Sequence, residues 1–311
     1  MIMSKKLVII LAVILFLAAA VEFIVILFLG ASKLNLTTGE NSVVVIRIDD
    51  VIYDAKKFTD RIDLYKDRDD VKAVVLRIET PGGTVAASQE LTSAVIRLRE
   101  KGKIVVSSIG NVGASGGYYV ASQSDIIVAN AGSITGSIGV LMEHFDIKQL
   151  ADKLGIRFDA ITSGPMKDAG TYTRPMKPEE RAVLELVIKD AYRQFFETVI
   201  DGRREAIANS VGVPADDTAA VESALKRIAD GRIFTGAQAV EFGLADEIGD
   251  IDDAIEIASK KAGIKGEINV INDNPESAWK EFKNAFGMAG KVFSNPSTMF
   301  VSTGGLWYLY R

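Results

Sequence analysis

The sequence lacks cysteine and has a single histidine among its 311 residues. Without cysteine there can be no disulfide framework, no thiolate nucleophile and no cysteine-based metal site. The residue that most often acts as a general base, histidine, is available only as His144. Basic residues are fewer than acidic ones, 36 against 41, for a net charge of −5. A basic surface for nucleic acid is therefore not expected, and nothing indicates a metal or another cofactor.

One long hydrophobic run is present, at residues 7–31, directly after Lys5 and Lys6. A helix needs about 20 apolar residues to cross a bilayer, and this run supplies them. The two lysines predict a cytoplasmic N-terminus with the remainder of the chain outside the cytoplasm. A cleavable signal peptide ending at residues 18–20 is the alternative, although the run continues past that site. Glu22 indicates a helix–helix contact in an oligomer or a carboxyl near the outer interface.

Composition divides the chain into four parts. We predict a cytoplasmic stub and transmembrane anchor at 1–31, a polar linker at 32–42, a globular domain at 43–265 and a C-terminal extension at 266–311. The extension ends in apolar and aromatic residues, 306–310, which are costly to leave in water. We therefore expect this tail to be ordered against the globular domain or a neighbouring subunit.

Short apolar runs alternate with helical patterns in the globular domain. Strands are predicted at 43–48, 73–78, 103–109, 125–130, 137–142 and 157–162, and helices at 54–66, 85–100, 178–208 and near Thr235 within 231–249. This alternation predicts βαβ units, a largely parallel sheet and the α/β class. In the longest helix an apolar stripe at helical spacing predicts a core face, with an oligomer contact as the alternative. The stripe consists of Leu184, Val187, Ile188, Tyr192 and Phe195.

Ser115 lies between glycines in the stretch NVGASGGYYVA, residues 111–121. A serine hydroxyl is a poor nucleophile until a neighbouring group takes its proton. A strand that ends in such a turn and opens a helix would present the hydroxyl, and the Gly116 N–H could donate to a developing oxyanion. Gly83 follows a neighbouring parallel strand, so its N–H should reach the same sheet edge. Taken alone, each glycine-rich turn also fits an ordinary tight βα connection.

Two residues could activate Ser115. His144 would complete a Ser–His–Asp triad, although an ordinary, partly exposed histidine is the simpler interpretation. Lys167 lies in a loop rich in glycine, proline and threonine, where α/β sheets collect functional residues. A lysine acts as a base when burial lowers its pKa, whereas the adjacent carboxylate of Asp168 would favour the charged amine.

Five ordered sequence blocks resemble the Ser/Lys peptidase family S49, the signal peptide peptidase A family. They are RIETPGGTV (77–85), NVGASGGYYVAS (111–122), NAGSITGSIGV (130–140), SGPMKDAG (163–170) and GRIFTGAQAVEFGLADEIG (231–249). The resemblance implies a ClpP/crotonase-like fold, Ser115 as nucleophile, Lys167 as general base, and Gly83 and Gly116 as the oxyanion hole. It also implies that Ser137 orients the lysine amine. The single anchor and single catalytic block resemble the short, single-domain form, in which neighbouring subunits complete each site in a ring with an apolar groove.

These features predict a single-pass membrane-anchored serine endopeptidase with its peptidase domain at 43–265. Its expected substrates are apolar peptides such as remnant signal peptides, and its expected partners are membrane lipid and further copies of the chain. Two alternatives are a crotonase-like acyl-thioester enzyme and a non-catalytic membrane scaffold. The first alternative leaves the anchor, Ser115 and Lys167 unexplained, but fold alone does not decide among the three.

Overall fold

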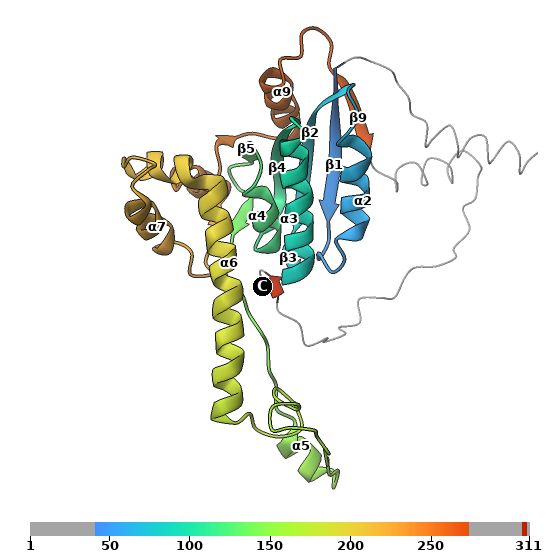
Figure 1. Ribbon diagram of the computed structural model, residues 1–311, viewed down its shortest axis with the longest axis vertical. Coiled ribbons are helices and arrows are strands. Elements are labelled where there is room, and N and C mark those ends of the chain that lie inside the picture. Colours follow the sequence, from blue (N-terminus) through green and yellow to red (C-terminus); the bar gives the residue numbers. More distant parts are fainter. Residues whose placement is uncertain (1–40, 274–306, 310–311) are drawn as a thin grey trace, which may run out of the picture. The chain divides into compact units, whose positions relative to one another are not determined.

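The computed structural model describes residues 41–273 and the backbone of 307–309 (Figure 1). All of these residues belong to one compact unit, which comprises residues 40–273 and 294–311. The predicted anchor at 1–31, with Glu22, lies outside the described residues. Among the described residues, no helix is both long and apolar enough to cross a membrane.

Eight strands of the described chain form one sheet, in which β7-β6-β4-β2-β1-β9 are neighbours and β5 pairs with both β4 and β8. Every pair in this sheet is parallel except β6–β7. The strands are β1 (Ser42–Asp49), β2 (Val71–Thr80), β4 (Ile104–Ala114), β5 (Ile126–Ala129), β6 (Ile134–Gly136), β7 (Ile233–Thr235), β8 (Glu247–Ile248) and β9 (Asn269–Asp273). The predicted parallel α/β architecture is confirmed.

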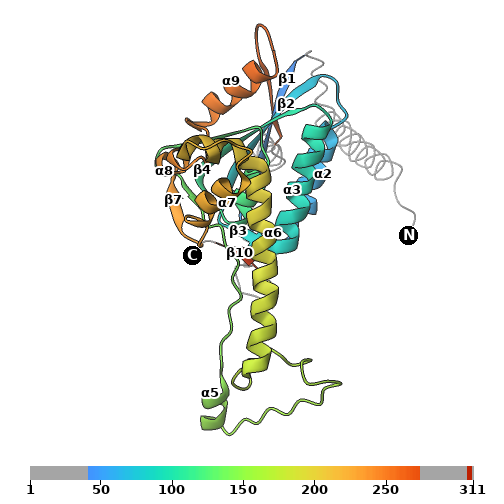
Figure 2. The same cartoon turned by 60° about the vertical axis from the view of Figure 1, so that its left-hand side comes forward.

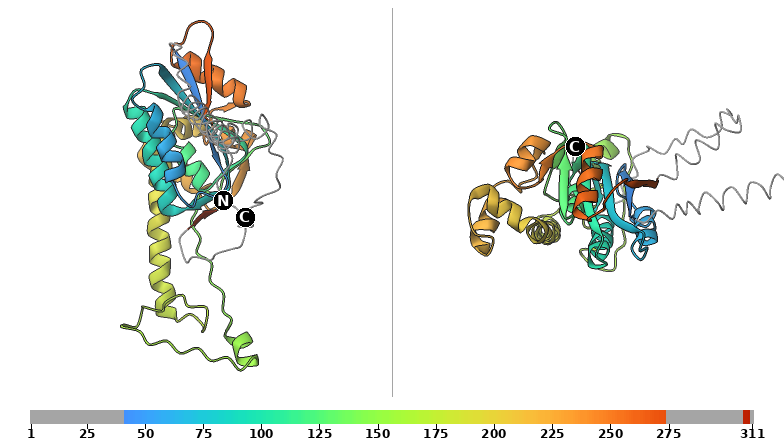
Figure 3. Two further views of the ribbon diagram at one scale, coloured as in Figure 1. Left: turned by 90° about the vertical axis from the view of Figure 1, so that its right-hand side faces the viewer. Right: turned by 90° about the horizontal axis from the view of Figure 1, so that it is seen from above.

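Helices cover both faces of the sheet (Figures 1 and 3). They are α2 (Lys56–Tyr65), α3 (Val85–Glu100) and α4 (Gly116–Ala121) on one face and α9 (Ile251–Lys261) on the other. Alternate residues of β1 serve the two faces, since Val44 and Ile46 join the core with α2 and α3, whereas Val43 and Val45 pack with α9. This two-sided burial explains why the central strands read as continuous apolar runs.

Two of the predicted strands are wrong. Residues 137–142 and 157–162 are irregular, and the strand in this part of the chain is β6, which ends just before Ser137. Beyond it the backbone departs into residues 143–177, here called the arm, which contains only the short helix α5 (Lys148–Lys153). Ile161 is 100% exposed, so the apolar run there has no neighbouring strand or core to pack on.

Helix α6 (Pro178–Val211) is long, as predicted, but only its second half joins the core. The Phe195 ring lies 4.8 Å from the Tyr119 ring of α4, measured between centroids. The predicted core stripe is wrong for the first half, where Val187 is 44% exposed and residues 181–190 include no buried side chain. That half extends past the sheet to the arm (Figure 2).

A buried ion pair fixes the second half of α6. Arg203, 3% exposed, donates to both carboxylate oxygens of Asp246 at 2.8 Å and to the Gly243 carbonyl at 3.1 Å. Asp246 also accepts from the Ile127 N–H of β5 at 2.7 Å. A short helix, α7 (Thr218–Lys226), follows α6. The predicted helix near Thr235 is α8 (Gly236–Glu241), which Thr235 caps.

Candidate active site

Ser115 is the single residue between strand β4 and helix α4. Its φ of 54° is uncommon for a residue with a side chain and carries conformational strain. Hydrogen bonds hold the backbone on both sides, since the Ser115 N–H donates to the Gly136 carbonyl and the Tyr119 N–H donates to the Ser115 carbonyl, each at 2.8 Å. The strained turn is therefore fixed by its neighbours.

Glycine is required on both sides of this turn. A Cβ atom added to Gly113 would lie 2.8 Å from Ile109 Cγ2, and one added to Gly117 would lie 2.7 Å from Thr80 Cγ2. Such distances are too short for a real side chain without movement of the neighbours. The glycines allow the end of β4 and the start of α4 to lie directly on β2.

The Ser115 hydroxyl is 1% exposed and its oxygen has no hydrogen-bond partner in the described structure. Most buried hydroxyls are paired, so an unpaired one calls for an explanation. His144 Nε2 is likewise buried and unpaired, so the Ser–His contact that the triad alternative requires does not form within the described chain. No contact from Lys167 satisfies the hydroxyl either.

Gly83 and Gly116 lie next to each other, as predicted for an oxyanion hole. A Cβ atom added to Gly116 would be 3.0 Å from Gly83 N and 2.4 Å from Ser88 Oγ. Gly83 belongs to the short strand β3 (Gly82–Thr84), which pairs with Ile52 through Gly82 O and Thr84 N, each at 2.9 Å. Because amide groups alternate along a strand, the N–H of Gly83 points away from Ile52.

The other edge of β3 pairs with strand β10 (Trp307–Leu309) of the C-terminal tail. The pairing is antiparallel and places Tyr308 opposite Gly83. The prediction that the tail is ordered against the globular domain is confirmed for the backbone of these three residues. An extended peptide thus lies along β3 beside the glycine pair.

Ser137 is also brought to this site. It directly follows Gly136, whose carbonyl holds the Ser115 N–H, and it is 6% exposed. Its φ of 52° makes it a second serine in a strained conformation at a strand end, and its N–H donates to the Arg232 carbonyl at 2.8 Å. Ser115, Gly83, Gly116 and Ser137 therefore form one cluster.

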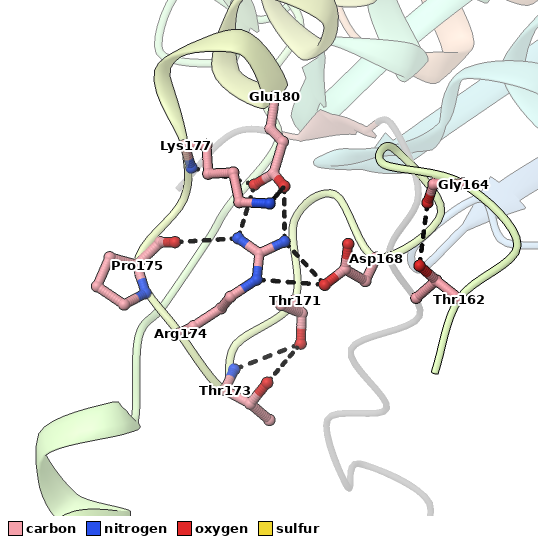
Figure 4. Close-up of polar contacts among 9 residues, drawn as sticks. All are labelled: Thr162, Gly164, Asp168, Thr171, Thr173, Arg174, Pro175, Lys177 and Glu180. Atoms are coloured by element: carbon pink, nitrogen blue, oxygen red, sulfur yellow. Dashed lines mark hydrogen bonds and ion pairs between the residues drawn. The ribbon is translucent and has the colours of Figure 1, made fainter. Parts of the chain in front are cut away.

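Lys167 is not part of this cluster. It lies exposed in the arm, where the next residue, Asp168, binds Arg174 at 2.8 Å, and Arg174 binds Glu180 at 2.6 Å (Figure 4). These contacts hold the Lys167 loop at the start of α6. The helix first hydrogen-bonds α3 at Gln194, and at 1.5 Å per residue this lies about 20 Å further along its axis.

Arg174 neutralises the carboxylate of Asp168 beside Lys167, an ion pair that the sequence analysis did not predict. Arg174 donates to Asp168 Oδ2 at 2.8 and 3.2 Å, so the carboxylate beside Lys167 already has a cationic partner. Glu180 is 1% exposed, and the hydrogen bonds from Arg174 lower its pKa to about 2. The available signal was an acidic residue in the first turn of a helix that begins with proline.

A strained serine between a strand and a helix, beside paired glycines on a parallel α/β sheet, defines a serine hydrolase type of site. The profile of "Peptidase family S49" matches residues 97–265. The chain therefore belongs to peptidase family S49 and is a serine peptidase. This membership favours peptide hydrolysis over the acyl-thioester and scaffold alternatives.

Three relatives show the extent of the likeness. The chain is 43% identical over 204 residues to "Putative protease slr0021" of Synechocystis sp., covering 65% of this chain and 68% of that protein. It is 35% identical over 211 residues to "Serine protease SPPA, chloroplastic" of Arabidopsis thaliana, covering 68% and 29%. It is 32% identical over 209 residues to "Putative signal peptide peptidase SppA" of Enterococcus faecium, covering 67% and 56%. The aligned region thus spans just over two thirds of the first relative and smaller shares of the other two.

Proposed function

We propose that the protein is a membrane-anchored serine endopeptidase that uses a Ser115/Lys167 dyad to cleave apolar peptides such as remnant signal peptides. The observation that carries this proposal is the Ser115 hydroxyl, which is buried in a strained turn, lacks any partner and lies in the cluster with Gly83 and Gly116. The hydroxyl is therefore free to interact with a base, and we propose that a second copy of the chain supplies that base.

The proposed roles of Ser115, Lys167 and the two glycines define the mechanism. The neutral amine of Lys167 takes the proton of Ser115, and the serine oxygen attacks the peptide carbonyl carbon. The N–H groups of Gly83 and Gly116 stabilise the oxyanion of the tetrahedral intermediate. Lys167 then gives the proton to the departing amine, and an acyl-enzyme remains. A water activated by the same amine hydrolyses the ester, while Ser137 orients the amine.

A second copy of the chain supplies Lys167. Within one chain the contacts of Arg174 with Asp168 and Glu180 hold the Lys167 loop at the start of α6, and the Ser115 hydroxyl has no partner among the described residues. The arm and the first half of α6 carry large exposed apolar side chains, which are typical of a surface that binds another protein. They are Phe145, Leu150, Leu154, Ile156, Phe158, Ile161, Met166, Tyr172, Val183, Leu186 and Val187.

The edge of β3 provides the peptide-binding surface. Peptides commonly add as a strand to an open sheet edge, where main-chain hydrogen bonds supply affinity. The chain's own β10 adopts this arrangement beside Gly83. A substrate in the same position would place its backbone next to Ser115. The hydrophobic run at 7–31 supports an anchor that keeps the site near membrane-derived peptides.

Labelling by a fluorophosphonate, followed by mass spectrometry, tests the nucleophile. We expect the label on Ser115 of the wild-type protein and none on Ser115→Ala, which should also fail to cleave an apolar peptide. His144→Ala should keep its activity within about tenfold of wild type, or ~1.4 kcal/mol of barrier. An inactive His144→Ala with an active Lys167→Ala would contradict the dyad.

A further inference from the structure

Thr80 is a fully buried residue that the proposed mechanism does not use. It is the last residue of β2 and is followed by Pro81 and β3. Its hydroxyl donates to the Asp50 carbonyl and accepts a hydrogen bond from the Gly82 N–H at 3.1 Å. One side chain therefore links the turn after β1 to the turn after β2.

Thr80 lies where the turns after β1 and β2 meet β3. Asp50, at a φ of 62°, leads into Ile52, whose N–H and carbonyl bond Gly82 O and Thr84 N. Pro81 has no N–H to donate, and Gly82, at a φ of 113°, adopts a conformation that residues with side chains rarely take. The Thr80 hydroxyl thus adds a side-chain link between the two turns to the backbone hydrogen bonds of Ile52.

The methyl group of Thr80 faces the turn that holds Ser115. A Cβ atom added to Gly117, at the start of the helix that follows Ser115, would lie 2.7 Å from Thr80 Cγ2. The same residue therefore touches the nucleophile turn through its methyl group and the glycine strand through its hydroxyl.

We propose that Thr80 is a positioning residue whose hydroxyl sets the place of the Gly83 N–H relative to Ser115. This inference rests on the proposed roles of Ser115 and Gly83. An oxyanion donor is effective only when it lies close to the position of the charged oxygen in the transition state. Displacing β3 should therefore weaken transition-state binding more than binding of the uncleaved peptide, and should reduce kcat rather than raise KM.

The test compares three purified full-length variants with wild type on a fluorogenic apolar peptide. Thr80→Val has the same shape without the hydroxyl, and Thr80→Ser keeps the hydroxyl without the methyl. Thr92→Val is the matched control, because Thr92 is 3% exposed and its hydroxyl donates to Ser88 O within α3. We expect Thr80→Val to lower kcat by about 10- to 100-fold with KM nearly unchanged. Thr80→Ser should recover most of the activity, and Thr92→Val should resemble wild type.

A transition-state analogue gives a second readout. A peptidyl boronate forms a tetrahedral adduct on the serine, and its inhibition constant should rise in Thr80→Val by the same factor as kcat/KM falls. If Thr80→Val does not fold, Thr80→Ala replaces it, because the smaller side chain also lacks the hydroxyl and fits within the space that Thr80 fills. A wild-type rate in the folded variant, or equal losses in Thr80→Val and Thr80→Ser, would overturn the inference. Failure of the fluorophosphonate to label Ser115 in the wild type would instead refute the proposed function.

Discussion

Two variants that are each inactive should restore activity when they assemble together. Under the proposed function, Ser115→Ala lacks the nucleophile but keeps the base, and Lys167→Ala lacks the base but keeps the nucleophile. If Lys167 acts on the Ser115 of a neighbouring chain, some sites in a mixed assembly contain both intact residues. If Lys167 acts within its own chain, every site in the mixture carries one defect.

The activity expected of the mixed assembly follows from which subunit supplies each residue of a site. Arg174 fixes the Lys167 loop at the start of α6, about 20 Å along the helix from its first bond to α3. A site shared across a head-to-tail interface takes its serine from one subunit and its lysine from the next. With the two variants in equal amounts and random order, each residue is intact in half of the positions. We therefore expect about one quarter of the wild-type activity per site.

Co-expression of the two variants with different affinity tags, followed by purification on both tags, gives only mixed assemblies. Initial rates with a fluorogenic apolar peptide are then compared with those of wild type purified in the same way. Each variant alone, carried on both tags, sets the background. Lys226→Ala is the matched control, because Lys226 is an exposed lysine of α7 outside both the proposed site and the proposed subunit contact, and its loss should leave the rate unchanged.

A mixed assembly that is as inactive as its parents would refute the shared site. That result would mean that the loop bearing Lys167 moves to Ser115 within one chain. Cross-linking of the mixed preparation shows that both variants are present in one assembly, so that failure to assemble cannot be mistaken for a negative result.

Three further predictions concern other parts of the site. Gly116→Ala places a methyl group 3.0 Å from Gly83 N and should lower kcat by about 100-fold in the peptide assay, and an unchanged rate would count against the oxyanion role. Hydrogen bonds from Arg174 lower the pKa of Glu180 from 4.5 to about 2, so this pair stabilises the arm above about pH 4.5 and loses that effect as the pH falls toward 2. The protection of arm amides against hydrogen exchange, taken relative to the intrinsic exchange rate at each pH, should accordingly fall at pH 3, and Glu180→Gln should show the lower protection already at pH 7; equal protection in both proteins would contradict this. Deleting residues 299–311 removes β10 and should lower the KM for a peptide about threefold or more without changing kcat, whereas an unchanged KM would show that the tail does not compete.

The sequence predicted those parts of the fold that depend on local pattern. Short apolar runs that alternate with helical patterns located the central strands, since each of these strands is buried on both faces. The glycines around Ser115 pointed to a turn in which backbone comes close, and the structure confirms that Gly83 and Gly116 meet there. Parallel strand ends gather at one edge of a sheet, and this rule is enough to bring those residues together.

Long-range packing could not be predicted from the same patterns. The apolar run at 157–162 has strand-like composition, yet Ile161 is fully exposed because no strand lies beside it. The first half of α6 has a helical apolar stripe, yet none of residues 181–190 is buried among the described residues. Periodicity reports which face of an element is apolar but not what covers it. Thr80 was overlooked for a related reason, since its hydroxyl matters through a turn 30 residues earlier in the chain.

The position of Lys167 in the arm, outside the cluster around Ser115, has a consequence for control. If Lys167 comes from a second chain, as proposed, a single chain is inactive until it assembles. Under the proposed function, the rate per subunit depends on the concentration of subunits, because dilution below the dissociation constant dismantles sites. Newly made chains would stay harmless until enough of them met, and confinement to a surface would favour that meeting. The enzyme would then be switched on by its own abundance.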